Sequence, residues 1–543
     1  MEKLTRPSTV WQAMVAARGR WPEHIAVIDA GRRVSYRELV EEIEVAAAAL
    51  IAADVAPGER VAIWAPNELA WIIASLAATS IGAVLVPMNT RFKGFEAADI
   101  LRRTSARLLF VHQGFLGHDY VAMLATAAGV EPTAESLASS FPSLAAIVDF
   151  SGQGSGGTIP WSQFLRPASA VALTEVRRRA EQVVTDDLCD IIFTSGTTGR
   201  PKGAMSAHRQ TIGVAWAWAQ AARVTPADNY LIVNPFFHTF GYKAGFLVCF
   251  LAGATVVPEM VFNPNEMLRL VEEERITILP GPPTIFHAML EHPNRLEHDL
   301  SSLRLASTGA AIVPVTLVER MQRELSFDTV LTAYGLSEAV VVTMSDPDDD
   351  PAVIARTVGT ATSDFELKVV GPGGETLAPE QTGEVCVRGP NLMTGYFEDP
   401  AATAAVIDRD GWLHTGDVGF LHRDGHLTIT DRLGDMFTVG GFNVYPAEVE
   451  QAITEFPGVL ECAVVPAPDE RLGSVARAIV VARPGHELEP NEIIGFVRAR
   501  LANYKVPAIV EIVAELPRNA GGKVLRRVLR DGASSGSSTV PSA

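Results

Sequence analysis

The hydrophobic pattern of the first 260 residues consists of short, continuous apolar runs that alternate with segments of helical composition. An apolar run within 57–67 (PGERVAIWAPN) is followed by a helical segment rich in small residues and by a second apolar run at 81–87 (IGAVLVP). Strands that are apolar at every position are buried on both faces, and their alternation with helices is typical of parallel sheets. The pattern therefore predicts an α/β fold whose parallel sheets are covered by helices.

A second copy of this arrangement predicts two related α/β subdomains. PADNYLIVNPF at 226–236 is followed by GFLVCFLAGATVVP at 245–258, and Gly253 occupies the place that Gly82 has in the first copy. The prolines of the two copies also correspond in position. We interpret the two copies as an approximate duplication. The alternative is that any two strand-helix-strand units look alike.

Beyond about residue 380 the pattern changes to short strands broken by Gly and Asp. Strands are expected at 383–389, 426–433, 436–446, 461–466 and 477–482, and helices at 447–456 and 490–502. This pattern predicts a small α+β unit that begins near Asp431. The predicted domains are 1–431, 432–530 and a Gly/Ser-rich tail at 531–543, which has little to bury and is expected to be disordered.

One uncharged stretch has the length of a membrane span. No charged residue lies between Glu68 and Arg91. The stretch contains Ser80, Gly82 and Pro87, so a buried helix that leads into a buried strand explains it better. No signal peptide opens the chain and its four cysteines are scattered, which favours a reducing cytoplasm and no integral membrane segment.

Composition excludes several classes of protein. The chain has 543 residues, 48% of them hydrophobic and 20% charged, which excludes a wholly disordered chain and predicts two or more structural units. The net charge of −18 gives no support to a nucleic-acid-binding groove. We therefore expect small-molecule ligands and no nucleic acid, and the sequence leaves the oligomeric state open.

The segment Asp190–Ala204 (DIIFTSGTTGRPKGA) has the composition of a phosphate-binding loop. An apolar strand leads into three glycines and several hydroxyl side chains, which allow backbone N–H groups to turn towards an anion. It is not a standard P-loop, because Lys202 lacks the following Ser or Thr that would hold Mg²⁺. The alternative is a mobile surface turn. The predicted phosphate-binding residues are Thr194, Ser195, Gly196, Thr197, Thr198, Gly199 and Lys202.

TSGTTGRPKG closely resembles the signature loop of the adenylate-forming superfamily, which includes acyl-CoA synthetases, luciferases and the adenylation domains of peptide synthetases. Seven other family motifs follow in the family's order up to about residue 528: NPFFHTFG (234–241), STGAA (307–311), YGLSE (334–338), WLHTGD (412–417), DRLGD (431–435), GGFNVYPAEVE (440–450) and PRNAGGKVLR (517–526). The resemblance implies a large N-terminal domain of two related α/β subdomains with a small β-barrel-like part. It also implies a small, mobile α+β C-terminal domain.

The resemblance assigns the rest of the nucleotide site. A carboxylate suits Mg²⁺ and an aromatic ring stacks on adenine, so Glu338 is expected to hold the metal and Tyr334 the base. By themselves, Glu338 would be a solvated surface acid and Asp417 a turn residue. By resemblance, Asp417 and Arg432 contact the ribose or phosphate. The remaining predicted nucleotide contacts are Gly309, Ala310, Ala311, Gly335 and Ser337.

Lys523 is expected to be the main catalytic residue, with Glu338 and His238 as the other two. Two anions meet when a carboxylate attacks the α-phosphate of ATP, and a lysine on a Gly-rich arm can supply a cation to that transition state. The resemblance implies acyl-adenylate formation and then thioester formation with coenzyme A, giving acyl-CoA, AMP and pyrophosphate. ATP, Mg²⁺ and coenzyme A are the implied co-substrates and cofactor.

Two further sites come from the resemblance. Gly440, Gly441 and Phe442 correspond to the hairpin that forms the pantetheine tunnel for coenzyme A. Gly434 stands at the family's hinge position, which is usually Asp or Lys. Glycine permits the backbone rotation, so we expect rotation to be preserved and the balance between conformers to change.

The acyl pocket is expected near Phe237, His238, Gly309, Gly335 and Leu336, with His238 as an aromatic gate beside the carboxylate. Lys243 is the less expected residue there. A buried lysine requires a partner, and if it points into the pocket it can donate to a ketone or a distal carboxylate of the acid. The alternative is a lysine whose ammonium reaches the surface.

The segments NPFFHTFGYKAG, PGPPTIF and LTAYGLSEA resemble acyl-CoA synthetases of actinobacterial sterol catabolism, which activate the propanoate side chain of a methylated indanedione. That resemblance implies an acid of sterol ring catabolism. A medium- or long-chain fatty acid or an aromatic acid is the nearest alternative. An enzyme that loads a separate carrier protein, a luciferase-like use of the adenylate and a non-catalytic nucleotide-binding module are the other classes.

Overall fold

The computed structural model of the chain describes residues 5–531, apart from 153–155, 167, 169–170, 195–200, 310–312, 314, 363, 433–434, 436, 440–441, 445, 470–471, 502 and 519–523. At 431, 432, 438, 442, 443, 473 and 531 it describes the backbone alone. The chain forms two compact units, each described by itself below. Unit 1 comprises Met1–Leu367 and Val387–Leu413, and unit 2 comprises Lys368–Cys386 and His414–Ala543.

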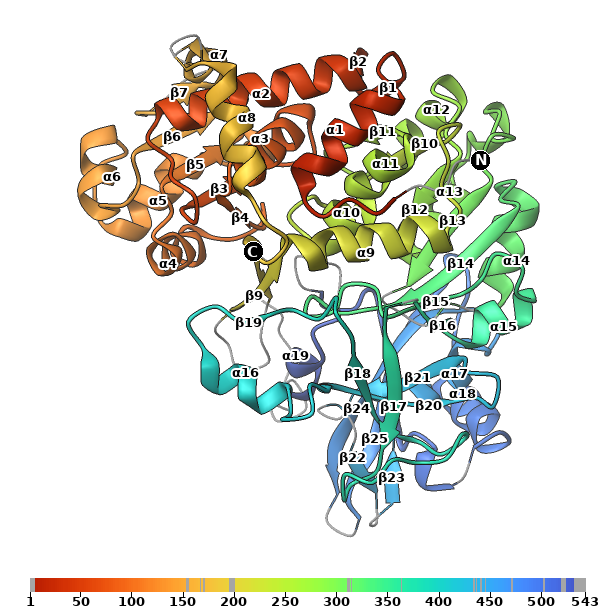
Figure 1. The fold of residues 1–543 in the computed structure, drawn as a ribbon. Helices are drawn as coiled ribbons and strands as arrows, with labels where there is room; N and C mark the ends of the chain where they lie inside the picture. Colours follow the sequence, from red (N-terminus) through yellow and green to blue (C-terminus); the bar gives the residue numbers. More distant parts are fainter. Residues whose placement is uncertain are drawn as a thin grey trace. The chain divides into compact units, whose positions relative to one another are not determined.

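A nine-stranded sheet forms one half of unit 1 (Figure 1). Its strands are, in spatial order, β16 (Thr360–Ala361), β15 (Thr343–Met344), β14 (Thr329–Tyr334), β13 (Leu305–Gly309), β12 (Ile278–Pro280), β10 (Asn229–Ile232), β11 (Thr255–Pro258), β1 (Ile25–Asp29) and β2 (Arg32–Ser35). The strands from β14 to β1 are parallel, so their carboxyl ends lie along one edge. Loops at such an edge are the usual ligand-binding positions of α/β folds.

An eight-stranded sheet forms the other half of unit 1. Its strands are, in spatial order, β19 (Gly395–Tyr396), β9 (Lys202–Ala207), β8 (Leu188–Thr194), β4 (Val84–Pro87), β3 (Arg60–Trp64), β5 (Leu108–Val111), β6 (Ala146–Asp149) and β7 (Ile159–Pro160). Strands β8 to β7 are parallel, whereas β9 turns back antiparallel beside β8.

Both sheets are buried on both faces, because neighbouring residues of one strand belong to different cores. Tyr230 and Ile232 of β10 pack in the core that the two sheets share, whereas Leu231 between them packs in a second core. The helices of the shared core include α1 (Val10–Arg20), α2 (Tyr36–Ala52), α3 (Leu69–Ser80), α9 (His208–Ala221) and α11 (Leu247–Ala252). The outer face of the nine-stranded sheet is covered by α12 (Pro264–Glu273), α13 (Pro283–Leu290) and α14 (Val315–Glu324).

The outer face of the eight-stranded sheet is covered by α4 (Gly94–Thr104), α5 (Tyr120–Ala128) and α6 (Ala134–Ser140). Local sequence fixes several helix ends. Ser35 and Glu38 form a capping box at the start of α2, and Asp119 caps α5. Further α-helices described in unit 1 are α7 (Trp161–Phe164), α8 (Leu173–Gln182), α10 (Thr239–Gly241), α15 (Pro351–Arg356) and α16 (Pro400–Val406).

The two predicted strand-helix-strand copies have the same structure. In the first, β3 and β4 pair in parallel with Ile63 opposite Pro87, and in the second β10 and β11 pair in parallel with Ile232 opposite Pro258. A glycine with φ of +80° ends the helix of each copy, Gly82 after α3 and Gly253 after α11. The positive φ explains why both positions are glycine. The prediction of two related α/β subdomains is confirmed.

Unit 2 contains the elements that the later part of the sequence predicts. A four-stranded sheet has the order β17 (Glu366–Val370), β18 (Gly383–Arg388), β20 (Leu413–Leu421) and β21 (Leu427–Arg432), and its outer strand ends reach the unit boundary. This sheet is the predicted barrel-like part. A hairpin, a three-stranded sheet and three helices follow: β22 (Phe437–Val439), β23 (Phe442–Val444), β24 (Val459–Asp469), β25 (Gly473–Ala482), β26 (Ile509–Val513), α17 (Pro446–Thr454), α18 (Pro490–Arg498) and α19 (Arg526–Asp531).

The α/β fold class is thus confirmed, including the small C-terminal α+β part. The division into compact units assigns the four-stranded sheet to unit 2, whereas the predicted boundary lies after Asp431; that boundary, and the mobility of the C-terminal part, stay predictions. The predicted tail 531–543 lies outside the described residues except for the backbone of Asp531.

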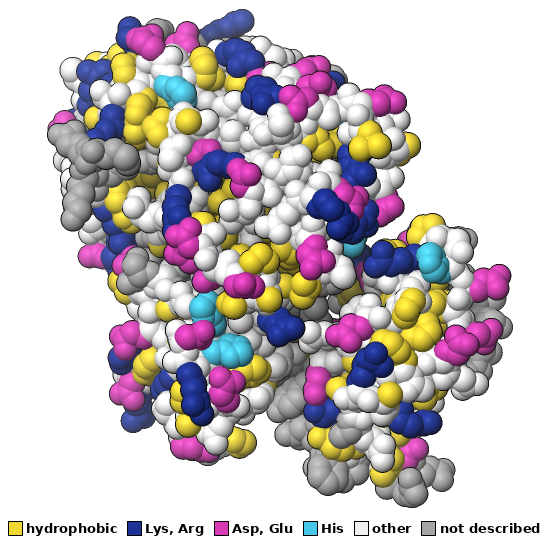
Figure 2. Space-filling view, turned by 90° about the vertical axis from the view of Figure 1, so that its right-hand side faces the viewer, with side chains coloured by type: hydrophobic (Ala, Val, Ile, Leu, Met, Phe, Trp, Pro, Cys, Tyr) yellow, Lys and Arg dark blue, Asp and Glu magenta, His cyan; other side chains and the backbone are white. Residues whose placement is uncertain are grey.

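The uncharged stretch before Arg91 forms α3 and β4, and α3 is buried along almost its whole length. Among the described residues, no helix combines the length and the apolar character that a membrane span requires. On the face shown in Figure 2, basic and acidic side chains are intermixed, without a continuous patch of one sign.

Candidate active site

The phosphate-loop segment is presented by a β-hairpin in unit 1. Strands β8 and β9 pair with Thr194 opposite Lys202, so both ends of the loop lie side by side. The Thr194 hydroxyl donates to the carbonyl of Lys202 at 3.4 Å, and Arg103 of α4 donates to the carbonyl of Pro201 at 2.8 Å. The loop is therefore fixed at both ends. Ser195, Gly196, Thr197, Thr198 and Gly199 lie outside the described residues.

Lys202 and Glu338 come together around a residue that sequence reasoning missed, Tyr396. The Tyr396 hydroxyl donates to Glu338 Oε1 at 2.6 Å, and Lys202 Nζ lies 5.1 Å from the centroid of the Tyr396 ring. The backbone of Glu338 is held as well, since the Met393 amide donates to its carbonyl at 2.7 Å. Glu338, the predicted metal ligand, and Lys202, the predicted phosphate-binding cation, thus both contact Tyr396.

Burial and the nearby Glu338 carboxylate together raise the pKa of Tyr396 above its ordinary value, which keeps its hydroxyl protonated as a donor. Tyr396 lies on β19, which adds to β9 with Tyr396 opposite Ala204. The sequence contains a Gly-Tyr pair in NLMTGYF at 391–397, but this pair does not indicate which residue Tyr396 contacts. Only the pairing of β19 with β9 places this side chain beside Glu338.

The predicted adenine contacts lie at the carboxyl ends of neighbouring parallel strands. Gly309 ends β13 and Tyr334 ends β14. A Cβ atom on Gly335 would lie 1.7 Å from the carbonyl oxygen of Val340, so the loop after β14 can close only around a glycine. Ser337 and Leu336 are half-buried in the same loop, and Ala310 and Ala311 lie outside the described residues.

Phe237 and His238 follow β10 at the same edge of the sheet, where Asn67 of the first copy fixes their segment. The Asn67 side chain accepts from the Phe236 amide at 2.7 Å and donates to the carbonyls of Ile232 and Asn234. His238 Nδ1 accepts from the Phe240 amide at 3.2 Å and caps the short helix α10. His238 is exposed at the surface of unit 1.

Lys243 is buried, with 1% of its surface exposed, on a π-helix over Tyr242–Phe246. Its Nζ lies 2.8 Å from Asp190 Oδ1 and donates to Ser206 Oγ at 2.8 Å. The alternative of an ammonium at the surface is therefore wrong. Its role in the acyl pocket stays a prediction.

In unit 2, the predicted ribose residues Asp417 and Arg432 lie opposite each other on β20 and β21. Glu384 of β18 fixes the turn before Asp417, because its carboxylate contacts His414 Nδ1 at 2.8 Å and accepts from the Gly416 amide at 3.2 Å. Glu384, Cys386 and His414 place possible ligand atoms within 4.8 Å of one another. A thiol and an imidazole do not suit Mg²⁺, so this group is not the predicted metal site.

Arg526, which follows Lys523 in the sequence, forms a partly buried ion pair. Arg526 donates to both carboxylate oxygens of Glu450, at 2.6 and 2.9 Å, and to the carbonyl of Val464 at 2.8 Å. Arg530, on the same helix, pairs with Asp435. Lys523, Gly434, Gly440 and Gly441 lie outside the described residues, and Phe442 is described by its backbone on β23.

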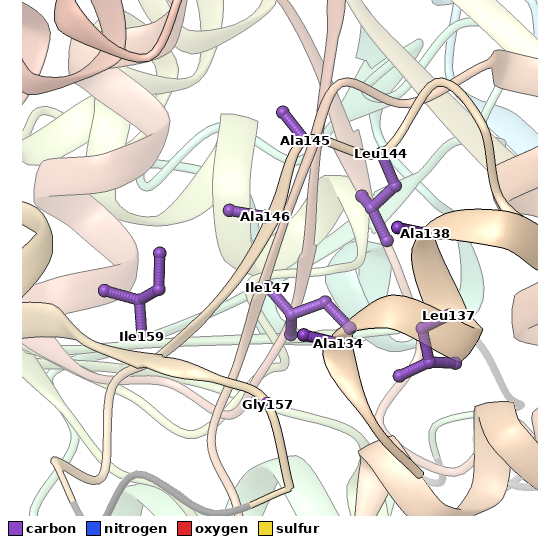
Figure 3. A pocket seen from close by; sticks show the side chains of 9 residues that line it. All are labelled: Ala134, Leu137, Ala138, Leu144, Ala145, Ala146, Ile147, Gly157 and Ile159. Atoms are coloured by element: carbon purple, nitrogen blue, oxygen red, sulfur yellow. The ribbon is translucent and has the colours of Figure 1, made fainter. Parts of the chain in front are cut away.

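Unit 1 also contains a cavity away from the predicted site residues. It is an apolar cavity of about 150 Å³ beside α6 and β6, lined by Leu137, Leu144, Ile147, Ile159 and smaller side chains (Figure 3). None of the predicted site residues lines it, and it contains no ionisable group. This cavity is therefore separate from the candidate active site.

Two family models match the chain. The model described as AMP-binding enzyme matches residues 15–397, and the model described as AMP-binding enzyme C-terminal domain matches residues 448–523. The chain is similar in structure to the anthranilate CoA ligase AuaEII in complex with anthranoyl-AMP, with a TM-score of 0.86 and 26% identity over 98% of both chains.

Two curated relatives bear the same name, 3-[(3aS,4S,7aS)-7a-methyl-1,5-dioxo-octahydro-1H-inden-4-yl]propanoyl:CoA ligase. The protein from Rhodococcus jostii is 51% identical over 527 residues, which cover 97% of this chain and 99% of the relative. The protein from Mycobacterium tuberculosis is 50% identical over 511 residues, which cover 94% of this chain and 96% of the relative. With its phosphate-loop hairpin, its Lys202–Tyr396–Glu338 cluster and these matches over nearly its full length, the chain belongs to the AMP-binding enzyme family and is an AMP-forming acyl-CoA ligase.

Proposed function

We propose that this ligase activates the propanoate side chain of a methylated indanedione, a bicyclic diketone acid of steroid ring catabolism. The observation that carries the proposal is the identity of 51% and 50%, over nearly the full length, to two ligases named for that acid. The segment 234–245 (NPFFHTFGYKAG) supports it, because it resembles the corresponding segment of such ligases. A medium- or long-chain fatty acid and an aromatic acid are the alternatives that the experiment must exclude. We expect the reaction to take place in the cytoplasm.

The proposed reaction has two steps. The carboxylate of the acid attacks the α-phosphorus of ATP, the bond to pyrophosphate breaks, and an acyl-adenylate forms. The sulfur of coenzyme A then attacks the acyl carbon, the bond to AMP breaks, and the thiol proton passes to solvent. Activation is needed because a carboxylate is a poor electrophile, whereas AMP is a good leaving group.

The loop between Thr194 and Lys202, together with these two residues, is proposed to hold the phosphates of ATP, and Glu338 to hold Mg²⁺. Glu338 suits a magnesium ion, because it is a half-buried carboxylate whose Oε1 is oriented by Tyr396. A bound Mg²⁺ would neutralise phosphate charge. Gly309, Ala310, Ala311, Tyr334, Gly335 and Ser337 are proposed to line the adenine site, with Asp417 and Arg432 at the ribose.

Lys523 is proposed to supply the cation for the first step and to leave for the second, with Gly434 as the hinge. Gly440, Gly441 and Phe442 are proposed to form the tunnel for coenzyme A. His238 is proposed to lie beside the carboxylate of the acid as an aromatic gate.

The test is a panel of acids with the purified chain, ATP, Mg²⁺ and coenzyme A. The panel contains the indanedione propanoate, decanoate, palmitate and ferulate, and thioester formation gives kcat/KM for each. We expect the indanedione propanoate to exceed the others at least about tenfold, as a pocket shaped for a bicyclic acid requires. A larger kcat/KM for any other acid would overturn the proposal.

Two further measurements separate the remaining classes. Exchange of pyrophosphate into ATP that depends on the acid reports the first step alone. Replacement of coenzyme A by a phosphopantetheinylated carrier protein then tests the carrier-loading alternative. Faster acyl transfer to the carrier than to coenzyme A would favour that alternative.

A further inference from the structure

Lys243, Asp190 and Ser206 form a buried charged group in unit 1 that the proposed reaction does not use. Lys243 is 1% exposed, Asp190 is fully buried and Ser206 is 4% exposed. A buried charge is costly unless it is paired and hydrogen-bonded. The presence of this charged group in the core therefore has to be explained by the elements that surround it.

The group joins three elements. Asp190 lies on β8 and Ser206 on β9, and these two residues are directly opposite each other in the ladder of the hairpin. Lys243 Nζ lies 2.8 Å from Asp190 Oδ1, in the geometry of an ion pair rather than of a directed hydrogen bond, and donates to Ser206 Oγ at 2.8 Å. One ammonium thus bridges both strands of the hairpin.

The second oxygen of Asp190 is also held. Thr211, a buried residue of α9, donates its hydroxyl to Asp190 Oδ2 at 2.7 Å. The carboxylate is therefore fixed from two sides, by a helix and by the π-helix that carries Lys243. A carboxylate held in this way cannot turn without breaking a buried contact.

The positions of these residues along the chain relate the group to the reaction. Asp190 precedes Thr194, where the phosphate loop begins, and Ser206 follows Lys202, where that loop ends. Lys243 belongs to the segment that follows Phe237 and His238, so the ammonium is attached to the proposed acyl-binding residues. A π-helix inside a helical segment is frequent at functional sites.

We infer that Lys243 is a positioning residue for adenylate formation. By bridging Asp190 and Ser206, it fixes the acyl-binding segment 237–246 relative to the hairpin that carries the phosphate loop. The inference rests on the proposed roles of these two segments. It makes the distance between the bound carboxylate and the α-phosphate depend on a side chain that touches neither.

This role differs in its consequences from a contact between Lys243 and a ketone of the acid. A ketone contact would make the effect of a substitution specific for the diketone acid. A positioning role makes the effect common to all acids, because every carboxylate must approach the same phosphate. Displacement of reacting groups by about 1 Å is sufficient for a loss of roughly 100-fold.

The test compares Lys243→Met, Asp190→Asn and their combination in the full chain. Each variant is assayed by pyrophosphate exchange with the indanedione propanoate and with decanoate. We expect each single variant to lower the exchange kcat by roughly 10- to 100-fold with both acids equally, and to change the KM for ATP less than about threefold. The double variant removes both buried charges and is expected to recover part of the stability that either single variant loses.

Leu268→Ala is the matched control, because Leu268 is fully buried on α12 in the second core, whereas both strands of the hairpin belong to the other sheet. If Lys243→Met does not fold, Asp190→Asn, which keeps the shape of the side chain, carries the test. A loss with the diketone acid more than about tenfold greater than with decanoate would overturn the inference in favour of a direct contact. An exchange rate no lower than that of a Leu268→Ala protein with the same loss of Tm would overturn it in favour of a purely structural role.

The result is independent of the proposed substrate. Which acid the parent enzyme prefers is decided by the panel of acids. The role of Lys243 is decided by comparing losses between acids in the same variant. Failure of one therefore leaves the other measurable.

Discussion

The contact between Tyr396 and Glu338 provides the sharpest prediction. Tyr396→Phe removes the hydroxyl that donates to Glu338 Oε1 at 2.6 Å and leaves the ring, which is 93% buried, in place. Hydrogen bonds to charged groups contribute about 1.5–3 kcal/mol, which corresponds to about 10- to 150-fold in a rate or equilibrium constant. The carboxylate loses its fixed orientation, and with it the geometry of the proposed magnesium site.

The assay is pyrophosphate exchange as a function of MgATP and of free Mg²⁺, at a fixed concentration of acid. We expect kcat/KM for MgATP to fall by about 10- to 150-fold and the Mg²⁺ requirement to rise. Tyr120→Phe is the matched control, because the buried Tyr120 hydroxyl donates to the neutral carbonyl of Thr90 at 3.3 Å and not to a charged group among the described residues. A Tyr396→Phe enzyme within about threefold of the parent in kcat/KM would refute the reasoning, since the hydroxyl would then have no role in holding Glu338.

Three further predictions concern other parts of the chain. Lys523→Ala is expected to lower adenylate formation, measured by pyrophosphate exchange, by roughly 100- to 1,000-fold. Thioester formation from preformed adenylate, measured by single-turnover assay, is expected to stay within about threefold of the parent. Equal losses in both steps would contradict the assignment of Lys523 to the first step. Arg526→Met removes the cation from the buried Glu450 carboxylate, which keeps only its hydrogen bond from the Val464 amide among the contacts of the described residues, so the free energy of unfolding in urea is expected to fall by about 1–3 kcal/mol, and an unchanged value would show that the pair is not needed. Burial lowers the pKa of His208 to about 4, so the neutral ring stabilises the fold fully above pH 6.5 and this contribution, roughly 3 kcal/mol, is lost as the pH falls towards 4. The free energy of unfolding of His208→Gln, measured from pH 7 to pH 4, is therefore expected to depend less on pH than that of the parent, and identical slopes would contradict it.

Much of the fold could be predicted because it depends on local pattern. Continuous apolar runs led to the parallel strands β3, β4, β10 and β11, and the matching positions of Gly82 and Gly253 led to the repeat. Both positions have a positive φ, which favours glycine, and this is why a glycine occurs at the same place in both copies of the sequence. Gly309 and Tyr334 are assigned to the nucleotide site by resemblance alone, and their positions at the ends of β13 and β14 come from the structure.

The pairing of side chains could not be predicted, because it depends on which elements become neighbours. Lys243 was recognised as unusual, yet its partner Asp190 lies 53 residues away in the sequence on a strand of the other sheet. Tyr396 was missed, because β19 is only two residues long and carries no hydrophobic pattern of its own. In both cases the packing of whole strands decides the contact.

The double burial of the strands in unit 1 limits where this enzyme can change its choice of acid. Because alternate residues of one strand fill separate cores, a substitution of different volume at any strand position disturbs one core or the other. The positions just after the carboxyl ends are less buried, as Phe237 and His238 after β10 are half-buried and exposed, respectively. Directed evolution towards a new carboxylic acid should therefore randomise those positions and leave the strands unchanged.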